Sequence, residues 1–384
     1  MEHVPILIAG GGLAGLSAAC VLAADGHGVT VVDPAPPPAP DERRPADRRT
    51  TAILQPGRDL LHAAGAWEMD VEPTPLAEMR VLDLLNGARS TFAAAEVSDR
   101  PFGWNVVNGA LRRSLAARAA ALGVRHVTGS VRALLLREAE ALATLEDGTR
   151  LRCDLVVGAD GKESRVRAAA GIGARTLRTG QRALSFAVAH EAPHESVSTE
   201  IYDCGGPMVL VPLPDADGEH RSAVVWMVPG GEARAIEGMA GAAFDAAVTA
   251  RSGGVLGPLR AVGERAVWPI VTRVADRFDG TRVALMAEAA HAVPPIGAQG
   301  LNMSLADVAA LRRACAEGVG DRAALAAYDR ARRPDVLMRV SAVTALNAAA
   351  IGAGPMAALR GAGIRALEAA PAARRRLMAL GLGA

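Results

Sequence analysis

The pattern of apolar and polar positions changes several times along this chain of 384 residues. Residues 4–33 begin with an apolar run at Ile6–Ala9, pass through a glycine-rich turn and an Ala/Leu-rich segment, and end in a second apolar run, Val29–Val32. A strand, a helix and a second strand in that order predict a βαβ unit. Apolar alternation in 124–157, interrupted by Asp147-Gly148, predicts a hairpin meander beside it.

A second β-rich stretch covers about residues 176–270, where MVLVPL and SAVVWMV are the clearest strands. The chain then returns to the strand-and-turn pattern of the first unit at 282–290 and closes in helices. We therefore expect a discontinuous first domain built on the βαβ unit, a separate sheet domain and a C-terminal helical part. The predicted boundaries are 1–73, 101–175 and 271–345 for the first, 74–100 and 176–270 for the second, and 346–384 for the third.

Composition narrows the class of protein. Half of the residues are apolar and the formal net charge is +1, which argues against disorder and against a nucleic-acid partner. The four cysteines are scattered without a CxxC pair, so we expect free thiols in a reducing compartment and no metal site. Without a signal-peptide pattern, a cytoplasmic location is expected. The apolar run 341–359 contains Asn347 and Pro355, which favours a packed helix over a membrane span.

The glycine-rich turn has the spacing of a dinucleotide-binding motif, Gly10-Gly11-Gly12-Leu13-Ala14-Gly15. In such a motif Gly10 makes a tight turn, Gly12 lets a diphosphate approach, and Gly15 allows close helix–strand packing. Leu13 and Ala14 open the helix, whose free N–H groups and dipole bind the phosphates. Asp33, at the end of the second strand, is placed to accept hydrogen bonds from an adenosine ribose. NAD and FAD fit this unit equally well.

A second segment, CDLVVGADGKESRVR at 153–167, distinguishes between the two cofactors. It runs from a strand through a Gly-Ala-Asp-Gly turn into a helix start. It resembles the DG motif of flavoprotein aromatic hydroxylases at six positions: Asp154, Gly158, Asp160, Gly161, Ser164 and Arg167. The resemblance implies that Asp160 and Gly161 serve the flavin nucleotide and the passage of a nicotinamide donor. An ordinary Asp-Gly turn is the alternative.

A third segment, AEAAHAVPPIGAQGLNMS at 287–304, is rich in glycine and proline and almost uncharged. Such bare backbone does not pack a core, and its prolines cannot donate to a sheet. The segment resembles the third signature of the same family, a Gly-Asp-Ala-Ala-His box followed by proline, glycines and a Leu-Asn pair. The resemblance implies that Glu288 holds the ribityl chain and that the backbone of Pro295 borders the oxygen-reactive face of the flavin. The amides of Leu301 and Asn302 would bind the pyrimidine end.

The remaining positions of this segment also carry expectations. The resemblance implies that Gly297 and Gly300 present backbone to the flavin, and that Pro295 and Gln299 lie nearest the reacting atoms. The family's Gly-Asp is Ala287-Glu288 here, a change that a small backbone shift would accommodate. His291 fits a framework role better than that of an acid or base.

Shorter matches support the same resemblance. Arg49, within DRRTTAI at 47–53, takes the place of an arginine that contacts the flavin, and Asn108 and Arg112 open a helix where the family places contacts to the diphosphate. The resemblance therefore implies an α/β fold of mixed α+β character. A Rossmann-like FAD-binding domain of the para-hydroxybenzoate hydroxylase type would carry an inserted antiparallel β-sheet substrate domain and C-terminal helices.

The third segment looks most like bacterial hydroxylases of ubiquinone biosynthesis. This implies an FAD- and NAD(P)H-dependent monooxygenase that hydroxylates an aromatic ring through a C4a-hydroperoxyflavin. Because no second dinucleotide motif is present, NADPH or NADH would bind transiently, with O2 as the other co-substrate. No arginine or lysine lies between Arg182 and Arg221, whereas hydroxylases of small benzoates bind the carboxylate with a cation from this sheet. This favours an uncharged phenol with an apolar tail, such as a polyprenylated phenol.

Other interpretations stay open at this point. The chain could act on another apolar aromatic, reduce a prenyl chain as a same-fold flavin oxidoreductase, or serve as a flavin-bound scaffold without turnover. Residues 354–384 intersperse arginines with leucine, isoleucine and methionine: Arg360, Arg365 and Arg374–Arg376. This pattern fits peripheral contact with an anionic membrane or a quinone-biosynthesis assembly, and equally a helix pair packed on the FAD domain.

Overall fold

The N-terminal βαβ unit is present in the computed structural model, which describes residues 1–38, 49–203, 205–352 and 354–382. It consists of β1 (Glu2–Ala9), α1 (Leu13–Ala24) and β2 (Val29–Asp33). Ile6, Leu7 and Ile8 of β1 have no exposed surface, as expected for a central parallel strand covered on both faces.

β1 lies in the first sheet, whose strand order is β17-β18-β11-β1-β2-β8. It pairs in parallel with β2 and β11, and β11 pairs in parallel with β18. β10 and β9 extend antiparallel from β11, and the β10–β11 turn falls at Asp147-Gly148, which confirms the predicted hairpin. The further strands are β8 (Arg125–Thr128), β9 (Val131–Leu136), β10 (Ala141–Leu145), β11 (Arg150–Gly158), β17 (Asp279–Gly280) and β18 (Val283–Leu285).

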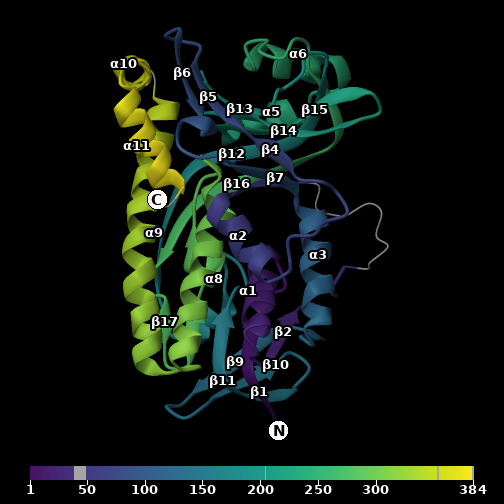
Figure 1. The fold of residues 1–384 in the computed structure, drawn as a ribbon, viewed down its shortest axis with the longest axis vertical. Helices are drawn as coiled ribbons and strands as arrows, with labels where there is room; N and C mark the ends of the chain where they lie inside the picture. Colours follow the sequence, from purple (N-terminus) through teal and green to yellow (C-terminus); the bar gives the residue numbers. More distant parts are fainter. Residues whose placement is uncertain (39–48, 204, 353, 383–384) are drawn as a thin grey trace.

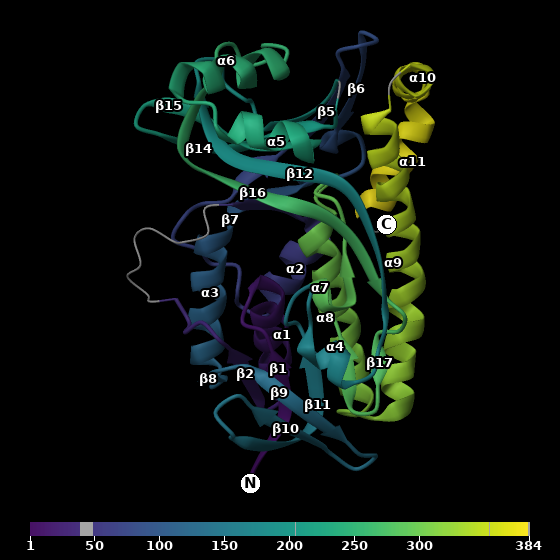
Figure 2. The ribbon, with the colours of Figure 1, turned by 180° about the vertical axis from the view of Figure 1, so that it is seen from behind.

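Helices cover one side of this sheet. α1 packs against α3 and α8, and α9 runs along α8 (Figure 1), while β9, β10 and α4 lie on the other side (Figure 2). Besides α1, the helices around this sheet, on either side, are α2 (Gln55–Ala63), α3 (Asn108–Ala121), α4 (Arg165–Ala169), α7 (Ala287–Ala290), α8 (Gln299–Glu317) and α9 (Arg322–Ile351).

The second sheet has the order β19-β16-β12-β15-β14-β13-β5-β6. The predicted MVLVPL and SAVVWMV strands are its members β14 and β15. The pair β13–β5 is parallel, because β5 and β6 come from a distant segment and no hairpin fixes their direction. The strands are β5 (Glu78–Asp83), β6 (Ala88–Ala93), β12 (Ala174–His190), β13 (Val197–Tyr202), β14 (Met208–Ala216), β15 (Glu219–Pro229), β16 (Arg260–Ala275) and β19 (His291–Ala292).

The two faces of the second sheet have different coverings. Phe244 and Val248 of α6 pack on its outer face with Leu184 and Phe186. Ala183, Met227 and Ile270 on its inner face pack with Ile296 and Val343 instead. A third, small sheet of β3 (Thr50–Leu54), β7 (Gly103–Val107) and β4 (Thr74–Leu76) contacts β14 of the second sheet. The remaining helices of the described chain are η1 (Ala94–Glu96), α5 (Gly230–Glu237), α6 (Gly241–Arg251), α10 (Pro355–Ala369) and α11 (Pro371–Leu382). The domain boundaries given above stay a prediction.

The C-terminal helices pack beside β5 and β6, and two of their arginines are used there. Arg360 Nε lies 3.0 Å from Asp83 Oδ2, and both side chains are buried. Arg374 pairs with Glu96 at 3.2 Å. The expected arginine face is therefore divided, because Arg360 and Arg374 bind this protein's own sheet region while Arg375 and Arg376 are exposed.

Candidate active site

The glycines of the first motif have separable roles. Gly10 has φ +111°, and a Cβ there would lie 2.3 Å from Ala159 O. A Cβ on Gly15 would lie 1.9 Å from Gly10 O, so both glycines are required by the fold. Gly12 has φ −74° and an added Cβ would meet no atom within 4 Å. Its glycine therefore leaves open space at the N-terminus of α1, where Leu13 and Ala14 begin the helix and unpaired N–H groups suit a phosphate.

Asp33 and the start of α3 border this open space. The Asp33 carboxylate accepts hydrogen bonds from Gly11 N at 2.6 Å and Ala35 N at 2.8 Å. From α3, Arg112 Nε donates to Gly11 O at 3.3 Å. Asn108 Oδ1 accepts from Thr51 Oγ1 at 2.7 Å. The structure thus brings together Asp33, predicted to bind the ribose, Arg112, predicted to contact the diphosphate, and the glycine loop.

Arg49 lies next to the substrate sheet. Its guanidinium is 5.7 Å from the centre of the Trp268 ring on β16, and its carbonyl accepts from Asn108 N at 2.8 Å. Arg49 therefore joins the cofactor-binding elements to the second sheet. The neighbouring Asp47 and Arg48 of the same motif lie outside the described residues.

The carboxylate of Asp160 caps α4. It accepts from Ser164 Oγ at 2.5 Å and from the N–H groups of Arg165 and Val166 at 2.7 and 3.1 Å. Gly161 follows with φ +83° and open space where a Cβ would be. The Asp160 side chain thus has a structural role, and the turn presents mainly backbone.

The second and third motifs are joined directly. Arg167 Nη1 donates to Ala289 O at 2.8 Å, and Lys162 Nζ lies 3.5 Å from Glu288 Oε1. The Glu288 side chain is 56% exposed, so it is accessible to a ribityl hydroxyl. If it holds one, Glu288→Ala should raise the FAD Kd by roughly 10- to 150-fold, since a hydrogen bond to a charged group contributes about 1.5–3 kcal/mol. Titration of the apoprotein with FAD measures this, and an unchanged Kd would remove Glu288 from the site.

Ala287, which stands where the family signature has glycine, has a backbone conformation that glycine favours. Its φ is +53°, a left-handed conformation that costs a residue with a Cβ roughly 1–2 kcal/mol. The expected small backbone shift does not take Ala287 out of this conformation. Ala287→Gly should therefore raise the free energy of unfolding by about 1 kcal/mol, after the greater flexibility of an unfolded glycine is deducted. Urea unfolding measures it, with Ala290→Gly in the same helix as a control that should destabilise.

Asp307 of α8 holds this turn in place, and sequence reasoning missed it. It is fully buried and accepts from Ala287 N at 3.0 Å, while His291 Nε2 lies 2.6 Å away and Arg332 Nε 2.8 Å away. Burial alone would raise the pKa of Asp307, but His291 and Arg332 hold it below its usual range. His291 is 2% exposed, in agreement with the expected framework role. Tyr328 also supports the segment by donating to Leu285 O at 2.8 Å.

The Pro-Pro-Ile-Gly segment leads into the N-terminus of α8. Ile296 is buried against the inner face of the second sheet, whereas Pro295 is half-buried and Gly297 is exposed with φ +61°. Because α8 begins at Gln299, the N–H groups of its first turn, including Gly300 and Leu301, lack partners within the helix. A Cβ on Gly300 would meet nothing within 4 Å. These amides can bind the electron-rich edge of a reduced flavin.

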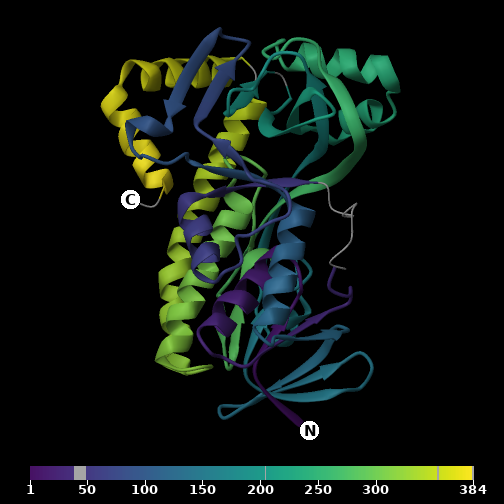
Figure 3. The ribbon, with the colours of Figure 1, turned by 45° about the vertical axis from the view of Figure 1, so that its right-hand side comes forward.

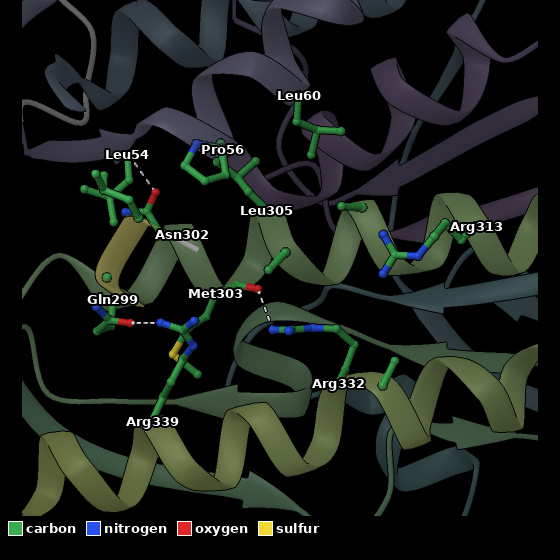
Figure 4. Close-up of a pocket in the computed structure, with 16 residues that line it drawn as sticks. Leu54, Pro56, Leu60, Gln299, Asn302, Met303, Leu305, Arg313, Arg332 and Arg339 are labelled. Carbon is green, nitrogen blue, oxygen red and sulfur yellow. Dashed lines mark hydrogen bonds between the residues drawn. The ribbon is translucent and has the colours of Figure 1, made fainter. Parts of the chain in front are cut away.

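The side chains of Asn302 and Gln299 make contacts within the protein. Asn302 accepts from Leu54 N at 2.9 Å and donates to Ala52 O at 2.8 Å, which ties β3 to α8. Gln299 Nε2 donates to Gly297 O at 3.0 Å, and its Oε1 accepts from Arg339 at 3.3 Å. Both line a cavity of about 280 Å³ between α2, α8, α9 and the end of α11 (Figure 4). The glycine loop does not line this cavity, and the catalytic role of Gln299 stays a prediction.

The inner face of the second sheet carries a polar pair, Glu200 and Tyr202, whose contact the sequence did not predict. Residues that are paired across neighbouring strands point to the same face of a sheet. Glu200 is paired with Val209, and Val209 with Val225, which packs with Ile296 on the inner face. Glu200 therefore also lies on the inner face. Tyr202 Oη donates to Glu200 Oε1 at 2.5 Å. Burial raises the pKa of Glu200, and burial together with Glu200 raises that of Tyr202.

The raised pKa of Glu200 has a testable consequence for stability. A carboxyl that binds its proton more tightly when folded stabilises the fold fully below its unfolded pKa, about 4.3, and loses that contribution as the pH rises through its folded pKa. Glu200→Gln removes the ionisation and keeps an acceptor for Tyr202. The variant should therefore gain stability relative to the wild type as the pH rises above about 4.3. Urea unfolding across this range measures it, and a constant difference would contradict it.

These surfaces fit FAD. The space at Gly12, the open turn at Gly161 and the unpaired first turn of α8 are three backbone surfaces with room for a ligand. Arg167 and Lys162 join the Gly161 turn to α7, which precedes α8. Gly10–Gly15, Asp33 and Arg112 would hold the nucleotide half, and Glu288 with the start of α8 would hold the flavin half. Among the described residues no group of three His, Cys, Asp or Glu side chains could hold a metal ion.

Comparison with known proteins defines the class. The FAD binding domain family matches residues 3–342, and the chain belongs to this family. The chain is an FAD-dependent monooxygenase, with FAD as its cofactor and NAD(P)H and O2 as the co-substrates typical of this enzyme class. The predicted family and enzyme class are confirmed.

Particular relatives extend over nearly the whole chain. It is 35% identical to the ubiquinone hydroxylase UbiL of Rhodospirillum rubrum, over 98% of this chain and 89% of the relative. It is 28% identical to the 3-demethoxyubiquinol 3-hydroxylase of Escherichia coli, over 100% of this chain and 99% of the relative.

Solved structures confirm the expected fold. PqsL of Pseudomonas aeruginosa, a probable FAD-dependent monooxygenase, matches with a TM-score of 0.76 at 23% identity, over 95% of this chain and 100% of its own. The p-nitrophenol 4-monooxygenase PnpA of Pseudomonas putida matches with a TM-score of 0.78 at 19% identity, over 100% and 97%. Within the described residues, no single helix is long and apolar enough to cross a membrane.

Proposed function

We propose that this monooxygenase hydroxylates the aromatic ring of an uncharged polyprenylated phenol, a precursor of ubiquinone. The names of the two relatives, a ubiquinone hydroxylase and a demethoxyubiquinol hydroxylase, support this substrate class. A cytoplasmic location belongs to the same proposal, in keeping with Cys20, Cys153 and Cys315, which are free thiols buried in the core.

The observation that carries the proposal is the apolar part of the inner face of the second sheet, formed by β12, β14 and β15. On β12 this face presents Gln181, Ala183, Ser185 and Ala187, and across from them lie Ala223, Val225 and Met227 of β15 and Val209 and Val211 of β14. The next inner-facing residue of β15, Arg221, is paired with Asp217. A benzoate carboxylate would meet no cation along this described stretch, whereas an apolar ring and tail can pack on it.

The protein's own groups then have limited tasks. When bound, FAD supplies the reduction and oxygen activation that no side chain here can provide. The Pro-Pro-Ile segment, whose Ile296 packs on the inner face, and that face itself would exclude water from the bound flavin and phenol. The Glu200–Tyr202 pair is a polar group on that face that can hold a proton for a phenol oxygen.

The test supplies the FAD-loaded protein with NADPH or NADH and a short-chain prenylphenol under labelled dioxygen. O2 uptake and the mass of the product are measured. We expect incorporation of one labelled oxygen atom, and no hydroxylation of 4-hydroxybenzoate in the parallel reaction. A product that gains two hydrogens without using O2 would instead identify a prenyl reductase. Absence of turnover with every phenol would favour the scaffold.

A further inference from the structure

An exposed apolar surface lies where the β5–β6 hairpin meets the start of α10. Its side chains are Leu84, Leu85, Met356 and Leu359, which are 39%, 48%, 45% and 66% exposed; we call these four residues the apolar corner. Both segments lie at the end of the molecule opposite the N-terminus (Figures 1 and 3). Large apolar side chains grouped at one extremity are a feature of interaction sites.

The two halves of the apolar corner are held together by specific contacts. Asn86, in the hairpin turn, donates from Nδ2 to Ala357 O at 2.9 Å, and Arg365 donates to Asn86 O at 3.3 Å. A Cβ on Gly361 would lie 2.6 Å from Asn86 Cβ, so the glycine lets the hairpin approach the helix. The four apolar side chains are thereby displayed by a fixed junction of two elements.

Buried Arg360 fixes this junction to the rest of the protein. It pairs with Asp83 at the end of β5, donates to the carbonyls of Ala349 and Ala350 at the end of α9, and lies 5.4 Å from the Tyr202 ring centre. Three elements therefore meet on one side chain, and the four side chains of the apolar corner keep 39–66% of their surface exposed.

The charge around the apolar corner is positive. Residues 84–95 and 354–367 contain no aspartate or glutamate, and the carboxylates that flank them are paired: Asp83 with Arg360, and Glu96 and Glu368 with Arg374. The two segments contain Arg89, Arg360 and Arg365, of which Arg360 is neutralised by Asp83. Arg89 and Arg365 are exposed, and the adjoining loop 252–258, SGGVLGP, is uncharged. Apolar side chains that insert among head groups, with arginines beside them, complement an anionic lipid surface.

We infer that the apolar corner is the surface by which this protein docks on an anionic lipid bilayer. The choice of a bilayer over a protein partner rests on the proposed function, because a polyprenylated phenol resides in lipid and must be collected there. The docking surface is thus the junction of the β5–β6 hairpin and α10. It is not the set of arginines in residues 354–384, because Arg360 and Arg374 are paired with Asp83 and Glu96 of this protein.

The test compares FAD-loaded full-length proteins in sedimentation with neutral phospholipid vesicles and with vesicles that contain anionic phospholipid. We expect salt-sensitive binding of the wild type to the anionic vesicles. The double variant Leu85→Asp/Leu359→Asp should lose about tenfold or more of this binding, because it replaces two inserting leucines with anions. Arg89→Glu should weaken binding to anionic vesicles more than to neutral ones.

The matched control is Leu135→Asp. Leu135 is 51% exposed on β9, at the other end of the molecule, and this variant should bind vesicles like the wild type. Equal binding by the double variant, or equal loss in the control, would overturn the inference. So would a change of oligomeric state caused by the double variant alone, which would make the apolar corner an interface between copies.

Turnover of the short-chain prenylphenol without vesicles separates the two proposals. The double variant should hydroxylate this dispersed substrate at the wild-type rate, since none of its changes touches the inner face of the sheet. If vesicle binding follows the pattern above while no protein hydroxylates the phenol, the proposed function fails and the docking surface stands. If the phenol is hydroxylated while no protein binds vesicles, the docking surface fails and the proposed function stands.

Discussion

Gly12→Asp is expected to give a folded protein that has lost FAD. The backbone at Gly12 suits any residue, with φ −74°, and an added Cβ meets no protein atom within 4 Å, so the fold has little reason to change. The new carboxylate would face the diphosphate. Two like charges 4 Å apart repel by about 4 kcal/mol at an effective dielectric constant of 20, which corresponds to about three orders of magnitude in Kd. Flavin absorbance of the purified protein and titration with FAD measure the effect.

Gly15→Ala is the matched control for this prediction. Its methyl group would lie 1.9 Å from Gly10 O, so this variant should be destabilised before any ligand is considered, with a lower urea midpoint for the apoprotein. Gly12→Asp should keep the wild-type midpoint in the absence of FAD. If the Gly12→Asp apoprotein is as unstable as the Gly15→Ala apoprotein, the loss of FAD comes from the fold and not from charge repulsion. Full flavin absorbance in Gly12→Asp would show that Gly12 does not face the cofactor.

The parts of the site that sequence could predict are those whose chemistry is local. A glycine spacing, a strand before it and an acid after it specify the loop because each residue acts on its own neighbours. The same holds for the helix start predicted in the second segment, which is the start of α4, where the Ser164 side chain accepts from Arg167 N. Positive φ at Gly10 and Gly161 follows from the same local reasoning.

What sequence could not predict are the contacts between distant segments. Asp307 sits inside an ordinary-looking helix, and only the fold brings it to Ala287 and Arg332. Glu200 and Arg360 likewise read as surface charges on an amphipathic strand and helix, but both are buried. A buried charge is identified by its partners, and here the partners are up to 277 positions away along the chain, as with Arg360 and Asp83.

The largest expected loss of stability belongs to Asp307→Asn. Removing this charge leaves buried Arg332 without its closest buried partner, and breaking one side of a buried ion pair typically costs about 3–5 kcal/mol. We expect the lower part of that range, because Arg332 keeps its contact with Asp335 at 2.7 Å. Urea unfolding of the apoprotein measures the difference. Asp335→Asn is the control, since Asp335 is partly exposed and should cost about 1 kcal/mol or less.

The pH dependence identifies the cause of that loss. Because the folded pKa of Asp307 is depressed, its contribution is complete above the unfolded pKa of about 3.9 and is lost as the pH falls through the folded value. The difference between wild type and Asp307→Asn should therefore be constant near neutral pH and shrink below about pH 4. If it stays constant at low pH, the loss comes from packing and not from charge. FAD affinity should also fall in this variant at neutral pH. The Asp307 carboxylate accepts a hydrogen bond from Ala287 N and so positions the next residue, Glu288, which is predicted to bind FAD.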